Sequence, residues 1–448
     1  MKKTMFRIVC ALFALTVLLT ASVGSAGAVT YSNDVDVKSK AVLLVSMDTG
    51  QTVYEKNADE KMYPASTTKI MTYIVAYENI PNIETARIEI KKAIIDKLRN
   101  TGSSMAFLSD HIGQKVSGKD LLYSLMVPSG NDAAMVLADY VGNGDVQVFV
   151  DKMNAKAKEL GCENTHFANP DGLHDSNHYT TARDLQKMTE YALTLPNFET
   201  ISNTARYTCE GDDTALVTTN GLIDSNSEYY YTYAKGIKTG TTDQAGRCLV
   251  TTASADGQSY LLILLGAPYQ EGVQEAYYTF TDAAALFRWC LVQLELVPIT
   301  TTETPQCETK LNYAMGKETI TLEPEHDINA VLPADRKPDD VVIKNEVPES
   351  LDAPLKKDQV VGTCSVYYKD PKTGEEQLVG SVNLLPAEAV DRSVAKTIID
   401  VFGTILKSYW FLFLIGAIVL VVVIYLIAAK IHRNRKRKRR DVKHYRNF

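Results

Sequence analysis

The clearest chemical signal in the sequence is a serine three residues before a lysine, in the stretch YPASTTKIMT at residues 63–72. Ser66 and Lys69 fall on one face of a helix, because residues three apart are neighbours there. A serine hydroxyl needs a base at neutral pH, and an amine serves when burial, or a second cation such as Lys238, lowers its pKa. The pair therefore predicts a nucleophile with its base. The alternative is an ordinary helix start, where hydroxyl residues cap free amides.

A second short set, Ser129-Gly130-Asn131, lies in a loop between two helical stretches. Ser129 is suited to relay a proton between the base and a leaving amine, and Asn131 offers its amide to a peptide carbonyl. The alternative for this set is a loop that caps a helix.

The third set, Lys238-Thr239-Gly240, suits the far end of a substrate. Lys238 and Thr239 offer a cation and a hydroxyl to a carboxylate, and Gly240 lets a substrate approach the strand closely. The backbone amides of Ser66 and Thr241 are the expected oxyanion donors. The alternative is a surface strand that ends in a turn.

The elements around these sets predict how they are brought together. An apolar stripe at helical spacing follows Lys69, and apolar runs at 248–253 and 260–265 flank Asp256-Gly257, which is a hairpin signal. A strand pair is expected at 40–57, with a helical block after it and a last helix before residue 295. The pattern predicts an α/β (α+β) domain at 29–295, in which helices cover an antiparallel sheet.

Both ends of the chain carry export or membrane signals. Residues 1–28 have a basic start, a short apolar run and a small-residue exit, as in a cleaved signal peptide; an uncleaved anchor is the alternative. Residues 409–429 contain 21 uncharged residues, enough to span a bilayer as a helix. The basic segment at 430–448 predicts a cytoplasmic tail and an extracytoplasmic body.

The part between these signals divides in two. The string PITTTETP near residue 300 indicates a linker, and the short strands and turns after it predict a small β-rich domain at 296–389. A helical pattern at 390–408 then leads into the membrane span.

Composition excludes several other classes of function. The net charge is −7 although the tail holds ten Lys and Arg against one Asp, so the exported part is acidic and nucleic acid is not an expected partner. His166, His174 and His178 lack a metal-binding spacing, so neither a metal nor another cofactor is expected. Six cysteines follow residue 28, and their pairing stays open.

In this order, STTK, SGN and KTG resemble the active-site motifs of low-molecular-mass penicillin-binding proteins, the serine D-alanyl-D-alanine carboxypeptidases. Flanking segments such as LMVPSGNDAAMVLADYV and GIKTGTTDQAGRCLV are similar to this family as well. The resemblance implies the penicillin-recognising, transpeptidase/β-lactamase-like fold at a bacterial cell membrane. It implies removal of the terminal D-alanine from peptidoglycan stem peptides through a Ser66 acyl-enzyme, which β-lactams also form.

Two departures from this family keep alternatives open. A full membrane span replaces the amphipathic anchoring helix, and no basic residue stands between Gly266 and Phe287, where relatives can place an arginine for the terminal carboxylate. A D,D-endopeptidase or transpeptidase preference therefore remains possible. A β-lactamase needs a glutamate, and Glu159 and Glu163 lie in the right interval without a matching string. A non-catalytic wall-binding protein is the remaining alternative.

Overall fold

The structure is a computed structural model that describes residues 31, 33–99, 101–210, 213, 215–269 and 277–444, with side chains as far as residue 437. The predicted signal peptide, residues 1–28, lies outside the described residues. Contacts divide the chain into two units, and the second consists of residues 300–327, 345–364 and 382 onward.

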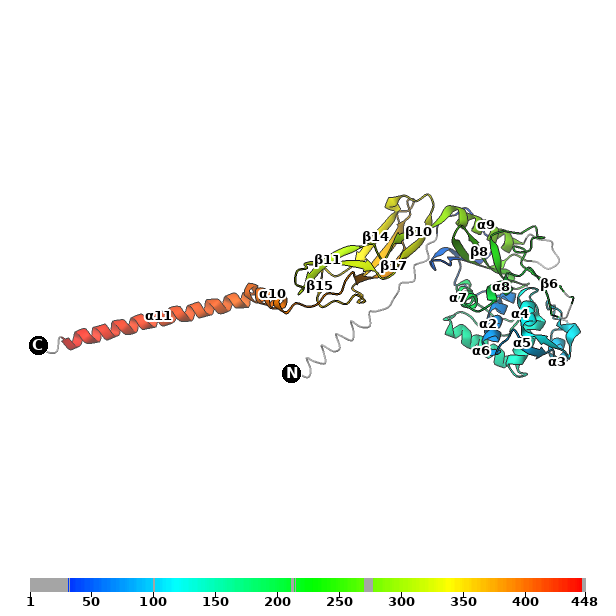
Figure 1. Cartoon of the computed structure of the whole chain (residues 1–448), viewed down its shortest axis with the longest axis horizontal. Helices are drawn as coiled ribbons and strands as arrows, with labels where there is room; N and C mark the ends of the chain where they lie inside the picture. The colour runs from blue at the N-terminus through cyan, green and yellow to red at the C-terminus, as the bar shows by residue number, and fades with distance from the viewer. Residues whose placement is uncertain are drawn as a thin grey trace. The chain divides into compact units, whose positions relative to one another are not determined.

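The first unit is built on a five-stranded antiparallel sheet with the strand order β2–β1–β9–β8–β7. Helix α9 contacts β8 and β9 on one face, and α7 contacts β1 and β9 from the side of the helical block (Figure 1). The bounds of the sheet strands and of α9 are β1 (Ala41–Ser46), β2 (Thr52–Lys56), β7 (Ala234–Thr242), β8 (Gly246–Ala255), β9 (Gln258–Ala267) and α9 (Tyr278–Gln293).

The helical block and its short strands lie between β2 and β7 in the chain. Their bounds are η1 (Ala65–Thr68), α2 (Lys69–Asn79), β3 (Arg87–Glu89), α3 (Lys92–Asp96), η2 (Leu108–His111), β4 (Lys115–Ser117), α4 (Gly118–Met126), α5 (Asn131–Val141), α6 (Val146–Glu159), α7 (Ala182–Leu193), α8 (Phe198–Ser202), β5 (Arg206–Thr208) and β6 (Ala215–Val217).

The predicted α/β arrangement is confirmed by these elements. The strand pair expected at 40–57 is β1 with β2, and the hairpin expected around Asp256-Gly257 is β8 with β9. Both turn residues have positive φ, +50° and +78°, as the tight hairpin turn requires. The third motif lies on β7, at the edge of the sheet.

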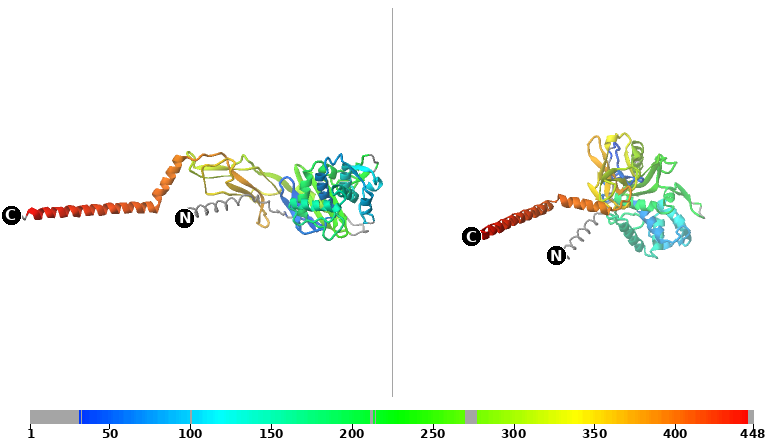
Figure 2. Two further views of the ribbon diagram at one scale, coloured as in Figure 1. Left: turned by 90° about the horizontal axis from the view of Figure 1, so that it is seen from below. Right: turned by 60° about the vertical axis from the view of Figure 1, so that its left-hand side comes forward.

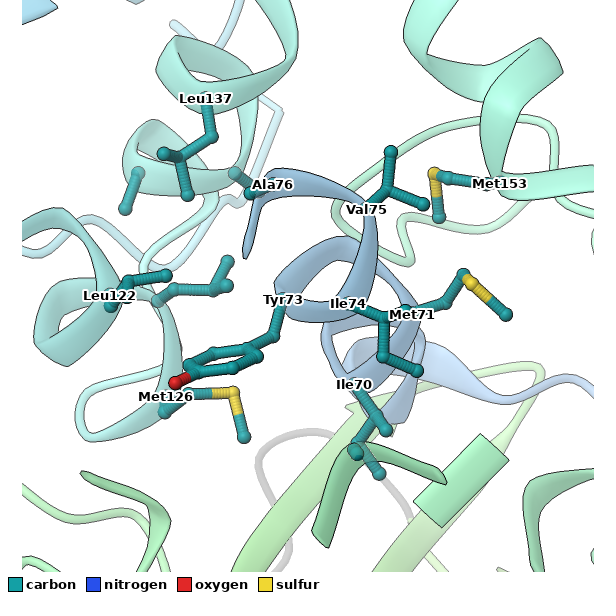
Figure 3. Packing of buried hydrophobic residues seen from close by; sticks show 14 of the residues in the cluster. Ile70, Met71, Tyr73, Ile74, Val75, Ala76, Leu122, Met126, Leu137 and Met153 are labelled. Carbon is teal, nitrogen blue, oxygen red and sulfur yellow. The ribbon is translucent and has the colours of Figure 1, made fainter. Parts of the chain in front are cut away.

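Helix α2 is the centre of the core, and its residues 69–76 are all buried. Burial around the whole circumference is typical of a helix segment enclosed by other elements. Figure 3 shows its side chains against Leu122 and Met126 of α4, Leu137 of α5 and Met153 of α6. Each fully buried apolar side chain of this size stabilises the fold by about 1.5–3 kcal/mol, and the helix packed in this way begins at Lys69.

The C-terminal β domain contains a six-stranded sheet with the order β14–β16–β17–β12–β11–β15 and a two-stranded sheet of β10 and β13. The bounds are β10 (Leu294–Thr300), β11 (Cys307–Asn312), β12 (Thr319–Pro324), β13 (Ile328–Pro333), η3 (Pro338–Asp340), β14 (Val341–Glu346), β15 (Ser350–Asp352), β16 (Gly362–Lys369) and β17 (Glu376–Pro386).

Two helices end the chain, α10 (Val394–Lys407) and α11 (Tyr409–His444), and they are separated by a bend at Ser408 (Figure 2). Within residues 409–437 of α11, a stretch of 18 residues has a mean hydropathy of 3.2, and none of its side chains is buried. Among the described residues, this is the helix long and apolar enough to cross a membrane. It includes the predicted span at 409–429.

Candidate active site

Ser66 lies in the short 3₁₀ turn η1, which leads directly into α2. Ala65, just before it, has a φ of +48°, a left-handed conformation that costs about 1–2 kcal/mol for a residue with a Cβ. Neither η1 nor α2 has a side-chain cap, so the helix-capping alternative does not describe Ser66. Its hydroxyl oxygen instead lies 2.9 Å from Nζ of Lys69.

The Lys69 ammonium is completely buried and surrounded by oxygen atoms. Besides the Ser66 hydroxyl, its Nζ donates to Oδ1 of Asn131 at 2.6 Å and to the carbonyl of Asp171 at 2.7 Å. Burial lowers the pKa of Lys69 to about 8, and the negative charges of Asp171 and Asp132 partly offset this effect. A useful fraction of the amine is therefore neutral near physiological pH, as a base for Ser66 requires.

A turn at residues 169–173 closes over the nucleophile, and it supplies the Asp171 carbonyl that Lys69 contacts. Gly172 allows this approach, because a Cβ there would lie 2.0 Å from the carbonyl oxygen of Ala65. The Asn169 side chain accepts from the Gly172 amide at 2.7 Å and fixes the turn. The sequence predicted only a loop near the site, and the Asn-Pro-Asp-Gly turn string was the available signal.

His178 connects the same turn to the start of the catalytic helix. The Thr68 hydroxyl donates to the carbonyl of Ala65, so Nε2–H of His178 donates to Thr68 Oγ1 at 2.8 Å. Nδ1 accepts from the Ala168 amide at 3.3 Å. Burial lowers the pKa of His178 to about 4, so this ring is neutral at physiological pH. Both ring nitrogens therefore form hydrogen bonds within the protein.

Ser129 is buried beside the same cleft in an unusual state. Its φ is +64°, it is 5% exposed, and its hydroxyl has no hydrogen-bond partner among the described residues. The N-cap residue of α5 is Gly130, which has no side chain to cap the helix, so the capping alternative does not describe this set. Asn131 directs Oδ1 to Lys69 and donates from Nδ2 to the Ser103 hydroxyl at 3.1 Å.

Strand β7 forms the opposite wall and brings Lys238 close to Lys69. Lys238 is 1% exposed, and its Nζ donates to the neighbouring carbonyl of Thr239 at 3.1 Å. Burial, and then the charge of Lys69, lowers the pKa of Lys238 well below its usual value. The sequence predicted that Lys238 lowers the pKa of Lys69. In the structure the repulsion lowers the pKa of Lys238, whereas the charges of Asp171 and Asp132 raise that of Lys69.

Gly240 has a structural role in addition to the one expected. A Cβ at this position would lie 2.8 Å from the Ser66 amide nitrogen and 3.0 Å from Pro64 oxygen. The glycine therefore lets β7 approach the turn that carries the nucleophile. Gly240 also lines the cavity, and the close approach of a substrate at this residue stays a prediction.

A cavity of about 370 Å³ joins the two walls. Lys69, Asn131 and Lys238 are not among its lining residues and lie behind them. Its lining residues are Ser66, Ser104, Ser129, Thr219, Thr239, Gly240, Thr241, Arg247, Cys248, Tyr277, Thr279 and Phe280.

Sequence reasoning missed two polar members of this wall. Thr219 lies 2.5 Å from the Thr239 hydroxyl, oxygen to oxygen, and extends the row of hydroxyl groups. Arg247 adds a guanidinium from β8. Neither residue belongs to a motif, and the signal for Arg247 was only its place across the hairpin from Thr241.

Two family models match the chain. One described as D-alanyl-D-alanine carboxypeptidase matches residues 28–269, and one described as penicillin-binding protein 5, C-terminal domain, matches residues 302–392. Among curated relatives, the D-alanyl-D-alanine carboxypeptidase DacF of Bacillus subtilis is 30% identical over 77% of this chain and 85% of its own length. A D-alanyl-D-alanine carboxypeptidase of Streptomyces is 38% identical over 49% of this chain and 77% of its own.

Solved structures agree with these matches. Penicillin-binding protein 5 from Haemophilus influenzae is 26% identical, with a TM-score of 0.66, over 81% of this chain and all of that one. A mutant of the Streptomyces K15 DD-transpeptidase is 32% identical, with a TM-score of 0.53, over 57% of this chain and 98% of that one. With its mixed α/β domain and C-terminal β domain, the chain belongs to the serine D-alanyl-D-alanine carboxypeptidase family of penicillin-binding proteins.

Proposed function

We propose that Ser66 is the nucleophile with which this chain removes the terminal D-alanine from peptidoglycan stem peptides. The observation that carries the proposal is the 2.9 Å contact between the Ser66 hydroxyl and the buried Lys69 amine, at the edge of a cavity lined by hydroxyl groups. Ser66 attacks the carbonyl of the D-alanyl-D-alanine bond, and neutral Lys69 takes the hydroxyl proton.

The other predicted residues have roles in the same step. The amides of Ser66 and Thr241 donate to the oxyanion, and the unpartnered hydroxyl of Ser129 passes a proton to the departing D-alanine nitrogen. Asn131 orients Lys69. Lys238 lies behind Thr239, and an incoming carboxylate raises the pKa of its amine so that the amine becomes positively charged. The C–N bond then breaks and leaves an ester at Ser66.

Hydrolysis of this ester needs a water molecule and a base. Lys69 and the carbonyl of Asp171 lie beside the Ser66 oxygen, 2.9 Å and 3.4 Å from it, and are suited to orient such a water. Glu159 and Glu163 are both exposed and neither lines the cavity, so the glutamate that the β-lactamase alternative requires has no support here. β-Lactams acylate the same serine and leave slowly.

A DD-transpeptidase activity is the second candidate, supported by the name of the Streptomyces K15 structure. Transpeptidation uses the same acyl-enzyme and differs in the acceptor, which is an amine instead of water. Product analysis in the presence of an acceptor amine separates the two.

We further propose that α11 anchors the protein in the bacterial membrane, with the basic tail in the cytoplasm and the catalytic domain outside. The predicted boundaries of the catalytic domain, 29–295, and of the β-rich domain, 296–389, belong to this proposal. In α10, exposed apolar residues such as Ile398, Phe402 and Ile405 suit the membrane surface just before the span.

The test is the intact mass of the full chain in detergent during exposure to a penicillin. We expect the mass of one drug molecule to persist on the wild type and to be absent in Ser66→Ala. D-alanine release from a pentapeptide then identifies the carboxypeptidase. An undiminished adduct in Ser66→Ala contradicts the proposal, and rapid destruction of the drug without an adduct indicates a β-lactamase.

A further inference from the structure

Asp132 is a buried carboxylate in the first turn of α5, directly after Asn131. It is 0% exposed and is not among the residues that line the cavity at Ser66, so it does not face a substrate there. Burial raises the pKa of this carboxyl group, but both of its oxygens accept hydrogen bonds from backbone amides, which favour the ionised form. The carboxylate therefore acts on the protein around it.

Two of the amide donors belong to a single segment, residues 103–108. The amide of Ala106 lies 3.0 Å from both carboxylate oxygens of Asp132, and the amide of Leu108 lies 3.2 Å from Oδ2. Residues 103–106 belong to no helix or strand, so no regular ladder of hydrogen bonds holds their backbone. The buried side chain of Leu108 anchors one end of the segment in the core, and Asp132 holds the part that leads away from it.

The same segment binds Asn131 at two points. The Asn131 backbone amide donates to the carbonyl of Ser104 at 2.7 Å, and its Nδ2 donates to the hydroxyl of Ser103 at 3.1 Å. A side-chain amide that is bound through its nitrogen has its oxygen directed the opposite way. Here that oxygen, Oδ1, accepts from Nζ of Lys69 at 2.6 Å. A continuous set of hydrogen bonds thus connects Asp132 with the base.

We propose that Asp132 is a positioning residue for the reaction at Ser66. It holds residues 103–108, and this segment directs the side chain of Asn131 at the amine of Lys69. The amine is thereby kept in line with the serine hydroxyl that it deprotonates. The role rests on the proposed function of Ser66.

The charges around Lys69 decide how such a role can be measured. Among the described residues, the ionisable groups that act on or respond to this amine are Asp132 of α5, Asp171 of the turn at 169–173, Lys238 of β7 and His178. The two carboxylates oppose the effect of burial on the pKa of Lys69.

Loss of the Asp132 charge should therefore lower the pKa of Lys69, because a nearby negative charge favours the ammonium form. Movement of Asn131 away from the amine acts in the same direction, since its oxygen is an acceptor for the ammonium. A residue that only stabilised the fold would leave the pH dependence of acylation unchanged.

The experiment measures acylation of the full chain in detergent by benzylpenicillin between pH 5.5 and 9, in the wild type and in Asp132→Asn. We expect the acylation rate at saturating drug to fall about 30-fold, because Lys69 is no longer aimed at the serine. We also expect the pH of half-maximal rate to move to lower pH by about half a unit. A fall in rate with an unchanged half-maximal pH means that Asp132 only stabilises the fold, and overturns the proposal.

The matched control is Asp282→Asn on α9. Asp282 is 4% exposed and likewise binds the amides of another segment, those of Lys38 at 3.1 Å and Ser39 at 2.8 Å. It is not among the charges that act on Lys69. We expect a lower melting temperature in this variant and the wild-type pH of half-maximal rate. A shift like that of Asp132→Asn would overturn the proposal, because any lost buried carboxylate would then produce it.

A second variant, Ser103→Ala, tests the last link without altering the core. It removes the hydroxyl that Asn131 contacts, so we expect acylation to fall about fivefold at an unchanged melting temperature. Combined with Asp132→Asn, it should add less than about twofold, because both changes act through one segment. Ser109→Ala, at an exposed position of η2, is the control and should behave as the wild type. Normal acylation by Ser103→Ala, or a full fivefold further loss in the double variant, overturns the proposal even if Asp132→Asn is unstable.

The wild type separates these outcomes from failure of the proposed function. A wild type that is acylated at Ser66, with variants that contradict the expectations above, overturns the role of Asp132 alone. A wild type that forms no Ser66 adduct overturns the proposed function and the role of Asp132 together.

Discussion

The two walls of the cleft each bury a lysine completely, yet they treat it differently. On the helix side, Lys69 has three oxygen acceptors within 3 Å and the charges of Asp171 and Asp132 nearby. On the strand side, Lys238 has one acceptor among the described residues, the carbonyl of Thr239. Burial lowers the pKa of both amines.

The comparison shows how one cleft obtains two different amines from the same residue type. Burial lowers the pKa of Lys69 to about 8, against the opposing effect of the negative charges of Asp171 and Asp132, so this amine gains and loses a proton readily. Burial, and then the charge of Lys69, lowers the pKa of Lys238 well below its usual value. A substrate carboxylate supplies a negative charge next to Lys238, so we expect Lys69 to act in the chemistry and Lys238 in substrate binding.

The strongest way to break this comparison is to remove each amine in turn. Lys69→Met should reduce acylation by a penicillin roughly 10⁴-fold, because the nucleophile loses its base. Lys238→Met should cost only about 100-fold, mainly through binding. Rates of adduct formation, measured by intact mass over a range of drug concentrations, separate the two. If both variants lose the same factor in the acylation rate at saturating drug, the two lysines do not have separate roles in chemistry and binding.

The approach of the two walls is tested at Gly240. In Gly240→Ala, the new Cβ meets the Ser66 amide at 2.8 Å, so we expect the nucleophile to shift and acylation to fall about 100-fold. Overpacking of this kind also destabilises the fold by about 1–3 kcal/mol. Gly403→Ala on α10 is the matched control, since its Cβ meets nothing within 4 Å. Normal acylation by Gly240→Ala would mean that the walls are not held at this distance.

The pH dependence of acylation sharpens the assignment of the base. Lys69 acts when neutral, so the rate should rise about tenfold per pH unit up to about pH 8 and then level off. The same rise should persist in Lys238→Met, because the titrating amine belongs to the helix side. Stopped-flow acylation between pH 5.5 and 9 measures both curves. Loss of the rise in Lys238→Met would assign the base to the strand side.

The smallest effect on activity is expected at His178, which supports the helix side from behind. Its pKa is about 4 in the fold against 6.5 when unfolded, so the unfolded chain binds more protons between these values. This residue's contribution to stability is present above pH 6.5 and is lost as the pH falls to 4, by up to about 3 kcal/mol.

The variant His178→Gln tests this, because glutamine donates to Thr68 without titrating. Melting temperatures at pH 7 and pH 4.5 should differ less for this variant than for the wild type, while acylation at pH 7 changes only a few-fold. The exposed His326 provides the control: His326→Gln should show the same difference in melting temperature between the two pH values as the wild type. If the difference in melting temperature between pH 7 and pH 4.5 is the same in His178→Gln as in the wild type, His178 makes no pH-dependent contribution to stability.

Local patterns predicted the elements well, because the strands, the hairpin and α2 depend on periodicity and turn chemistry. The three motifs were also recognisable, since each occupies a helix start, a loop or a strand of fixed type. The carbonyl of Asp171 was not predicted, because any residue offers a carbonyl and only the fold aims it. Arg247 was missed for a similar reason: its meaning comes from a partner across the sheet. Gly240 was recognised as a point of close approach, but the approaching group depends on tertiary packing.

Position 129 is one at which folding and activity favour different residues. A serine there has a left-handed backbone and a buried hydroxyl without a partner among the described residues. Glycine would remove both costs, a matter of about 1–3 kcal/mol. The serine therefore lowers the stability of the fold, and a ligand in the cleft that forms a hydrogen bond with this hydroxyl would raise it again. A thermal-shift screen should accordingly reward compounds that reach Ser129, even when they never react with Ser66.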